Sequence, residues 1–113
     1  MSDYFDAARI AELQDVLGAD TESILASMLG SMTRAIERLE AAMAAGELSG
    51  AVESAHRARN DALMLSAGSL QGALTELEDA ARRGDEAEAE AALERVRQVW
   101  PPTREALSHA CVR

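Results

Sequence analysis

Apolar residues recur at steps of three and four through residues 21–46, and this spacing restricts the structure that the segment can form. Such steps place side chains on one face of an α-helix, whereas a half-buried strand needs alternation at every second residue. The segment ends near Gly46, a residue that commonly follows the last turn of a helix. We therefore predict a long amphipathic helix with Ile24, Leu25, Met28, Leu29, Met32, Ile36, Leu39 and Met43 on its apolar face.

Glycines and capping residues divide the rest of the chain into further helices. The first expected helix is short, runs from Asp6 to Gly18 and has Ile10, Leu13, Val16 and Leu17 on one face. The long helix follows, capped by Asp20 or Thr21, and a third helix runs from about residues 47–49 to Leu65. After a turn at residues 66–69 come a fourth helix that ends at Gly84 and a fifth that is opened by Asp85 and Glu88. Trp100-Pro101-Pro102 should break or kink the fifth helix, because proline lacks a backbone donor. A short C-terminal helix would then start near Thr103.

The composition agrees with an all-α fold of one domain. The 113 residues suffice for one modest core, and aromatic residues make up only 3% of the chain. Leu, Ala, Met, Glu and Arg, which favour helices, are abundant. We predict a single domain over residues 1–113, built as an antiparallel four-helix bundle with a short N-terminal helix packed across it. The methionines of the long helix are interpreted as core filling.

The formal net charge of −9 argues against several classes of function. Binding to nucleic acid or to an anionic membrane surface requires a basic face. No apolar stretch has the length of a transmembrane helix, and the N-terminus does not resemble a signal peptide. A lone cysteine, Cys111, permits no intramolecular disulfide and suits a reducing compartment. We expect a cytoplasmic protein that contacts neither nucleic acid nor membrane.

His56 is predicted to lie on the outer face of the third helix. The apolar positions Leu48, Ala51, Ala55, Ala58, Ala62 and Leu65 form one stripe, and His56 points roughly 130° away from its middle. Val52, Arg59, Asn60 and Leu63 share the outer face with it. Two apolar residues beside an imidazole and a guanidinium are typical of a docking patch. An ordinary solvated surface histidine remains the alternative. His109, the other histidine, is interpreted as a solvated or capping residue.

The chemistry available at His56 is nucleophilic. A neutral imidazole attacks phosphorus near pH 7 and forms a labile phosphoramidate. Arg59, one turn later, can hold phosphoryl oxygens with its planar fork, and Arg57 adds positive charge. Glu53, one turn earlier, is a candidate hydrogen-bond partner for a ring nitrogen. The acidic and basic residues between Glu78 and Arg95 are interpreted as a solvated helix face.

The residues around His56 resemble the signature of the histidine phosphotransfer (HPt) domain family. Members have an Ala-His pair, a Lys three residues after the His, then Gly and a small residue, and later a Leu-Glu pair without an intervening gap. The matching run here begins at Ala55-His56-Arg57-Ala58-Arg59-Asn60-Asp61-Ala62-Leu63 and continues through Leu70 and Leu74 to Leu77-Glu78. Phe5-Asp6, Gly18-Ala19-Asp20 and Ala44-Ala45-Gly46-Glu47 are similar to the usual beginning of the family.

The resemblance implies a phosphorelay intermediate. His56 would accept a phosphoryl group from the aspartyl phosphate of a receiver domain and pass it to another receiver, with no kinase activity of its own. Arg59 would replace the family's Lys in stabilising the phosphoryl group. The docking surface would comprise Val52, Glu53, Arg57, Asn60 and Leu63. The chain would bind no cofactor or metal, because the receiver supplies Mg²⁺, and it would act as a monomer. Expected partners are response-regulator receivers, with a hybrid sensor kinase as a further candidate.

Two positions depart from the family pattern. Asn60 stands where the family has Gly, about 40° from His56 on the helical wheel and one turn along. A Gly there lets another protein approach closely, so we expect Asn60 to slow transfer or restrict it to fewer partners. Asp61 replaces a small residue, but it points away from His56 and matters less.

Two alternatives to a carrier stay open. The altered Asn60-Asp61 pair is compatible with a pseudo-phosphotransfer module that docks receivers without chemistry. The Glu53-x-x-His56 spacing also occurs in di-metal carboxylate bundles. Such sites need a second motif and inward-facing carboxylates, and the pair Glu105 and His109 has the wrong spacing.

Overall fold

The computed structural model describes the backbone of residues 5–111, and every regular element in that range is helical. The elements are α1 (Ala7–Leu17), a 3₁₀ turn η1 (Gly18–Asp20), α2 (Thr21–Ala44), α3 (Leu48–Met64), α4 (Gly68–Arg82) and α5 (Glu86–Cys111). The four long helices agree with those predicted from the apolar spacing. The predicted turn at residues 66–69 is shorter than expected, because α4 already begins at Gly68.

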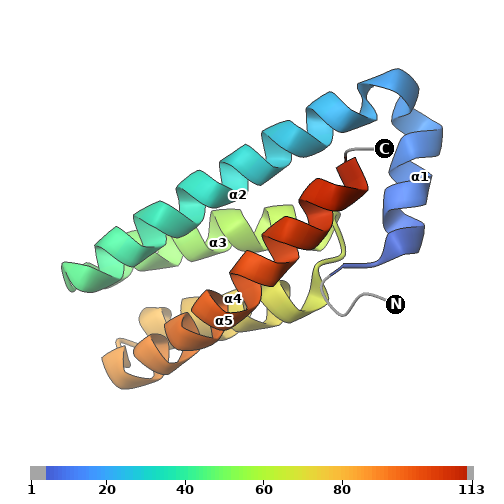
Figure 1. Cartoon of the computed structure of the whole chain (residues 1–113). Coiled ribbons are helices and arrows are strands. Elements are labelled where there is room, and N and C mark those ends of the chain that lie inside the picture. Colours follow the sequence, from blue (N-terminus) through green and yellow to red (C-terminus); the bar gives the residue numbers. More distant parts are fainter. Residues whose placement is uncertain (1–4, 112–113) are drawn as a thin grey trace.

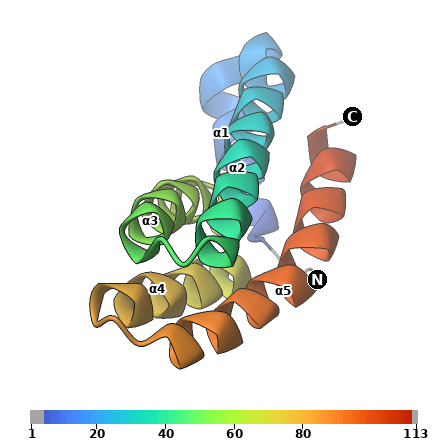
Figure 2. The same cartoon turned by 90° about the vertical axis from the view of Figure 1, so that its left-hand side faces the viewer.

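The four long helices form an antiparallel bundle, and α1 lies across one end of it (Figure 1). Helix α3 packs between α2 and α4, α4 packs against α5, and α5 returns to contact α2. Figure 2 shows the same arrangement from the side, with α1 beside the start of α2. The predicted fold class, an all-α four-helix bundle with a short N-terminal helix, is confirmed. Helix α3 presents a long outer face between its two neighbours, and this face carries His56.

Two aspartates cap helices as predicted, and one does not. Oδ1 of Asp6 accepts a hydrogen bond from the backbone N–H of Ala8 at 2.9 Å, and Oδ1 of Asp85 accepts one from Glu88 at 3.1 Å. These bonds satisfy donors that the first turn of a helix leaves free. The proposed side-chain cap by Asp20 is wrong. Residue 20 instead belongs to η1, which leads directly into α2, so its carboxylate makes no capping bond.

The turn between α2 and α3 depends on Gly46. Its φ is +71°, a left-handed conformation that costs about 1 kcal/mol or more for residues with a Cβ atom. This geometry lets the N–H of Glu47 reach the carbonyl of Ala42 at 2.9 Å, which closes the end of α2. The chain then reverses at once, so that α3 begins at Leu48 and runs antiparallel to α2.

The expected helix break at Pro101 and Pro102 is wrong. Helix α5 continues without interruption through both prolines, and no separate C-terminal helix begins at Thr103. The prolines remove two helical donors and displace nearby carbonyls, so the helix bends instead of ending; Figure 2 shows this change of direction along α5. Burial of Trp100, Thr103 and Leu107 holds both halves against the bundle.

Small and aliphatic side chains build the core. Met32 and Met43 are buried and Met28 is partly buried, which confirms core filling by the α2 methionines. Each fully buried leucine or methionine stabilises the fold by about 1.5–3 kcal/mol relative to exposure. Val16, predicted to share the apolar face of α1, is 81% exposed, because the bundle covers only the opposite edge of that short helix. None of the helices in the described range is long and apolar enough to cross a membrane.

Candidate functional site

Alanines on the inner face of α3 determine where His56 points. Ala51, Ala55, Ala58 and Ala62 are fully buried, so the helix lies with this face against its neighbours. His56 follows Ala55 and is displaced around the helix from that stripe. Its side chain is 47% exposed, which confirms the predicted outward orientation.

The ring of His56 pairs with Glu78 of α4. Nδ1 lies 3.2 Å from Oε2 of Glu78. Glu53 was predicted as the ring's partner, and that prediction is wrong: Glu53 is exposed and lines a shallow groove on the α2 side of the helix. The ring instead turns towards α4, which packs along the opposite edge of α3. Two helices, not one, therefore build the site.

Glu78 is a buried carboxylate held by cations. Its side chain is only 5% exposed, so its assignment to a solvated face is also wrong. Arg82, one turn later on α4, donates to Oε2 from Nε at 3.2 Å and from Nη2 at 2.8 Å. Nε of Arg59 lies 3.4 Å from Oε1. Burial raises the pKa of the Glu78 carboxyl, but the hydrogen bonds from Arg82 and His56 and the charge of Arg59 outweigh it and hold the pKa below 4.5.

Two contacts compete at Nδ1 of His56, and each requires a different tautomer of the ring. Nη2 of Arg59 lies 3.0 Å from Nδ1, and a guanidinium can only donate. Nδ1 cannot accept from Arg59 and donate to Glu78 at the same time. Oε2 of Glu78 also accepts from Nε and Nη2 of Arg82, so the buried carboxylate keeps hydrogen bonds in either tautomer. A proton on Nδ1 adds a hydrogen bond from the ring to the buried carboxylate and leaves a lone pair on Nε2, and this is the tautomer that phosphoryl transfer to Nε2 requires.

The low pKa of Glu78 gives a pH-dependent contribution to stability. A carboxyl whose folded pKa is below its unfolded value stabilises the fold fully above the unfolded pKa and loses this contribution as the pH falls through the folded pKa. Glu78→Gln should lower the free energy of unfolding by roughly 2 kcal/mol at pH 7. The difference from wild type should shrink as the pH falls below 4.5. Urea unfolding of both proteins at pH 7 and pH 3 measures it, and a difference independent of pH would contradict this assignment.

The other predicted site residues divide between the two edges of α3. Leu63 is 56% exposed and Asn60 is exposed, and both lie on the same outer face as His56. Val52 is partly buried on that face. Arg57 is exposed and lines the same groove as Glu53, on the side of α2. On α3, His56 and Arg59 therefore lie towards α4, where both contact Glu78. Glu53 and Arg57 lie on the opposite edge, which faces α2.

Asp61 lies away from His56, as its place on the helical wheel predicted, but it is not a solvated residue. Its Oδ2 atom is buried and has no hydrogen-bond partner. Within residues 5–111, no group of three or more His, Cys, Asp and Glu side chains is placed to hold a metal ion. The site at His56 consists of one imidazole, one carboxylate and two guanidiniums, a set that binds anionic oxygen better than a cation.

Comparison with known proteins places this arrangement in a family. The model of the Hpt domain family matches residues 23–109, a range that includes His56, Arg59 and Glu78. No curated protein matches the chain. Among solved structures, the crystal structure of histidine-containing phosphotransfer protein B (HptB) from Pseudomonas aeruginosa PAO1 has the same fold, with a TM-score of 0.90. The two sequences are 24% identical, and the alignment covers 98% of this chain and 96% of HptB.

The family match spans most of the chain, and the fold agrees over nearly all of it. Hpt domains carry phosphoryl groups on histidine in phosphorelays and are carriers rather than catalysts. The exposed imidazole of His56, on the outer face of the third helix of a four-helix bundle, is compatible with that role. The chain belongs to the Hpt domain family.

Proposed function

We propose that His56 accepts a phosphoryl group from the aspartyl phosphate of a receiver domain and passes it to a second receiver. The exposed ring, with Nδ1 bound to a buried carboxylate, is the observation that supports this proposal. It leaves Nε2 as the free nucleophile on a face that a partner can reach. The partners are receivers of response regulators or of a hybrid sensor kinase, which also supply Mg²⁺, and the chain acts as a monomer.

The transfer balances without an external acid or base. The lone pair of Nε2 attacks phosphorus, the bond between phosphorus and the aspartyl oxygen breaks, and the aspartate leaves as a carboxylate. The phosphorylated ring keeps its proton on Nδ1 and gains positive charge, which the carboxylate of Glu78 stabilises at 3.2 Å. Arg59 lies close enough to the ring to turn from Glu78 to the phosphoryl oxygens. Reverse transfer follows the same steps in the opposite order.

The test is incubation with a ³²P-phosphorylated receiver and Mg²⁺. We expect label on this chain that is labile in acid and stable in base, as a phosphohistidine requires. Mass spectrometry should map it to the peptide that contains His56. His109→Gln is the matched control, because His109 is exposed and forms an ion pair with Glu105 at 3.7 Å on α5, so its loss should leave labelling unchanged. Label on another residue would contradict the proposal.

A pseudo-phosphotransfer module is the second candidate. The observation that favours it is Asn60, whose exposed side chain lies on the same outer face as His56, one turn along the helix. Such a module would bind receivers without taking up label. Calorimetry of the mixture separates the two functions: binding together with label supports the carrier, and binding of every cognate receiver without label supports the module.

Replacement of Asn60 should change the rate at which the carrier accepts the phosphoryl group. Asn60→Gly should raise the rate of transfer from the receiver roughly fivefold, because the smaller residue permits closer approach to His56. Glycine in a helix also costs about 1 kcal/mol of stability, so Asn60→Ala is the control that removes the side chain but keeps the helix. Both variants should be faster than wild type in a single-turnover assay. Equal or lower rates in both would show that Asn60 does not crowd the site.

A further inference from the structure

Some arginines of this acidic chain form ion pairs, and others in the described range do not. All eleven basic residues are arginines, against twenty acidic residues. Most arginines of the described range form ion pairs within the bundle, such as Arg97 with Glu40 and Arg95 with Glu76. Within residues 5–111, the arginines without an ion pair are Arg34, Arg38, Arg57 and Arg104.

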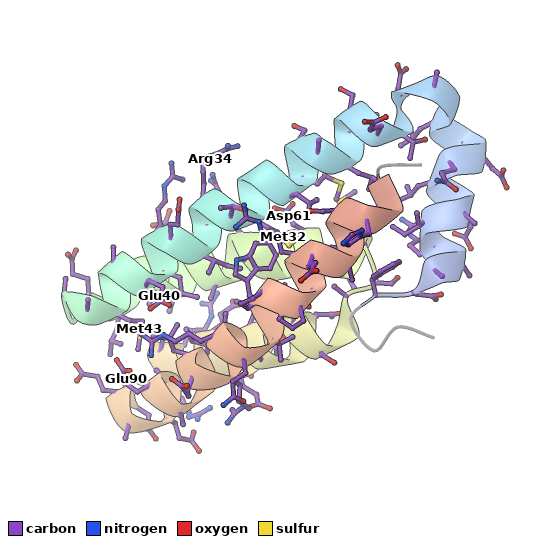
Figure 3. All side chains as sticks on the ribbon, viewed as in Figure 1. Met32, Arg34, Glu40, Met43, Asp61 and Glu90 are labelled. Atoms are coloured by element: carbon purple, nitrogen blue, oxygen red, sulfur yellow. The ribbon has the colours of Figure 1, made fainter. Side chains whose placement is uncertain are left out.

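Three of these four arginines lie on neighbouring parts of α2 and α3. Arg38 and Arg57 line one groove between the two helices, together with Ala35, Glu53 and Ser54. Arg34 lies one turn before Arg38 on the exposed side of α2, and Figure 3 shows it projecting away from α5. We call Arg34, Arg38 and Arg57 the arginine surface. Arg104 lies apart from it, on α5.

No carboxylate in the described part of the chain forms an ion pair with the arginine surface. Glu53 lines the same groove but forms no ion pair with Arg38 or Arg57. Glu37 precedes Arg38 and points about 100° away from it around α2. Asp61, on α3, has a buried Oδ2 atom without a partner and pairs with none of the three arginines. The three guanidiniums therefore keep their full donor capacity for an external anion.

The arginine surface borders the phosphoacceptor. On α3, Arg57 is displaced about 100° from His56 towards α2, whereas Arg59 is displaced about 60° the other way, towards α4. The α4 edge is occupied by the ion pairs of Glu78. The α2 edge is the one that offers unpaired cations to a protein approaching His56.

We propose that the arginine surface is the positively charged part of the receiver-docking face and contacts the acidic residues around the receiver's phosphorylation site. The inference rests on the proposed function and extends the docking face from α3 onto α2. A receiver that presents an aspartyl phosphate and holds Mg²⁺ with carboxylates carries negative charge around that site. A carrier with a net charge of −9 would repel it without a local basic patch beside the nucleophile.

The test uses the full chain and the phosphorylated receiver that labels wild type fastest. Arg38→Gln is the principal variant, since Arg38 lies on α2 and makes no contact with the ring of His56. Arg104→Gln is the matched control, because it removes an equally unpaired arginine from α5. At low salt, the second-order rate of transfer should fall about fivefold in Arg38→Gln and about twentyfold in Arg38→Gln/Arg57→Gln. Arg104→Gln should match wild type.

Ionic strength and saturation provide the second readout. The wild-type rate should fall steeply between 20 and 300 mM salt, roughly tenfold, and the double variant should show a much shallower slope. The rate at saturating receiver should stay near wild type, because the arginines act in encounter and not on phosphorus. Equal rates and salt slopes in Arg38→Gln, Arg104→Gln and wild type would overturn the docking inference while leaving the carrier function intact. Failure of wild type to accept label from any receiver would instead overturn the proposed function itself.

Discussion

A chain carrying His56→Gln is expected to accept no phosphoryl group from a receiver, with at least a thousandfold loss of labelling. The amide of glutamine is not a nucleophile, and the only other histidine, His109, lies near the end of α5. The fold should persist, because His56 is half exposed and its loss removes one hydrogen bond to Glu78, worth about 1–3 kcal/mol. Single-turnover labelling and thermal unfolding by circular dichroism are the two measurements.

The control for this prediction is receiver binding. Glutamine is close to histidine in size, so His56→Gln should still bind an unphosphorylated receiver with wild-type affinity. Retention of acid-labile label in a folded His56→Gln chain would mean that another residue carries the phosphoryl group.

Replacement of Glu78 should give the second largest loss. In Glu78→Leu the ring of His56 loses its acceptor, and the proton is free to move to Nε2, which leaves that atom without the lone pair that attacks phosphorus. We expect transfer to slow roughly thirtyfold, the effect typical of losing a residue that orients a reactive imidazole. A leucine of similar volume fills the buried position, and Arg82 and Arg59 can turn to solvent, so the fold should survive.

Glu78→Gln is the matched variant for this effect. Its amide oxygen still accepts from Nδ1, so transfer should fall only a few-fold although the protein loses stability. A structural role for Glu78 would instead make the rates follow stability, with Glu78→Gln and Glu78→Leu ordered by their melting temperatures. Rates that order by hydrogen-bond acceptance at Nδ1 identify Glu78 as a positioning residue.

The helices could be predicted because the sequence repeats its signals along their whole length. Seven of the eight predicted apolar positions of α2 are buried or partly buried, whereas Ile24, at the margin of that face in the first turn, is 37% exposed, contrary to the prediction. Gly18, Gly46 and Gly84 mark helix ends where φ is in fact positive. The outward direction of His56 followed from the alanine stripe of α3 in the same way. Periodicity within one helix is a local property, and no tertiary contact changes it.

Glu78 could not be placed by the same reasoning, because its burial depends on a second helix. It follows Leu77 and lies about 40° from Leu74 on the helical wheel, at the margin of the apolar face of α4. A charged residue at that margin is solvated unless a neighbour covers it, and α3 is the neighbour that does so. Glu53 was a plausible partner for His56 by sequence distance alone. The one sequence signal for a role of Glu78 is the Leu77-Glu78 pair, which is part of the pattern that resembles the HPt family.

The helix break predicted at the prolines of α5 is wrong for the opposite reason: the local signal is strong, but tertiary packing outweighs it. Pro101 and Pro102 cannot donate hydrogen bonds, and an isolated helix would end before them. Here Trp100 on one side and Leu107 on the other are buried in the core. The hydroxyl of Thr103 also donates to the carbonyl of Val99 at 2.7 Å, which satisfies the hydroxyl of this buried residue within the helix. Burial across both halves outweighs the lost backbone bonds, and the helix bends.

The central claim is that Glu78 fixes the proton of His56 on Nδ1 and leaves Nε2 to receive the phosphoryl group. Two-bond ¹H–¹⁵N correlation NMR of the ¹⁵N-labelled chain at pH 8, before and after phosphorylation, measures both parts directly. We predict the Nδ1–H tautomer for His56 in the free protein and phosphorus attached to Nε2 afterwards. An Nε2–H tautomer, or phosphorus on Nδ1, would contradict the account.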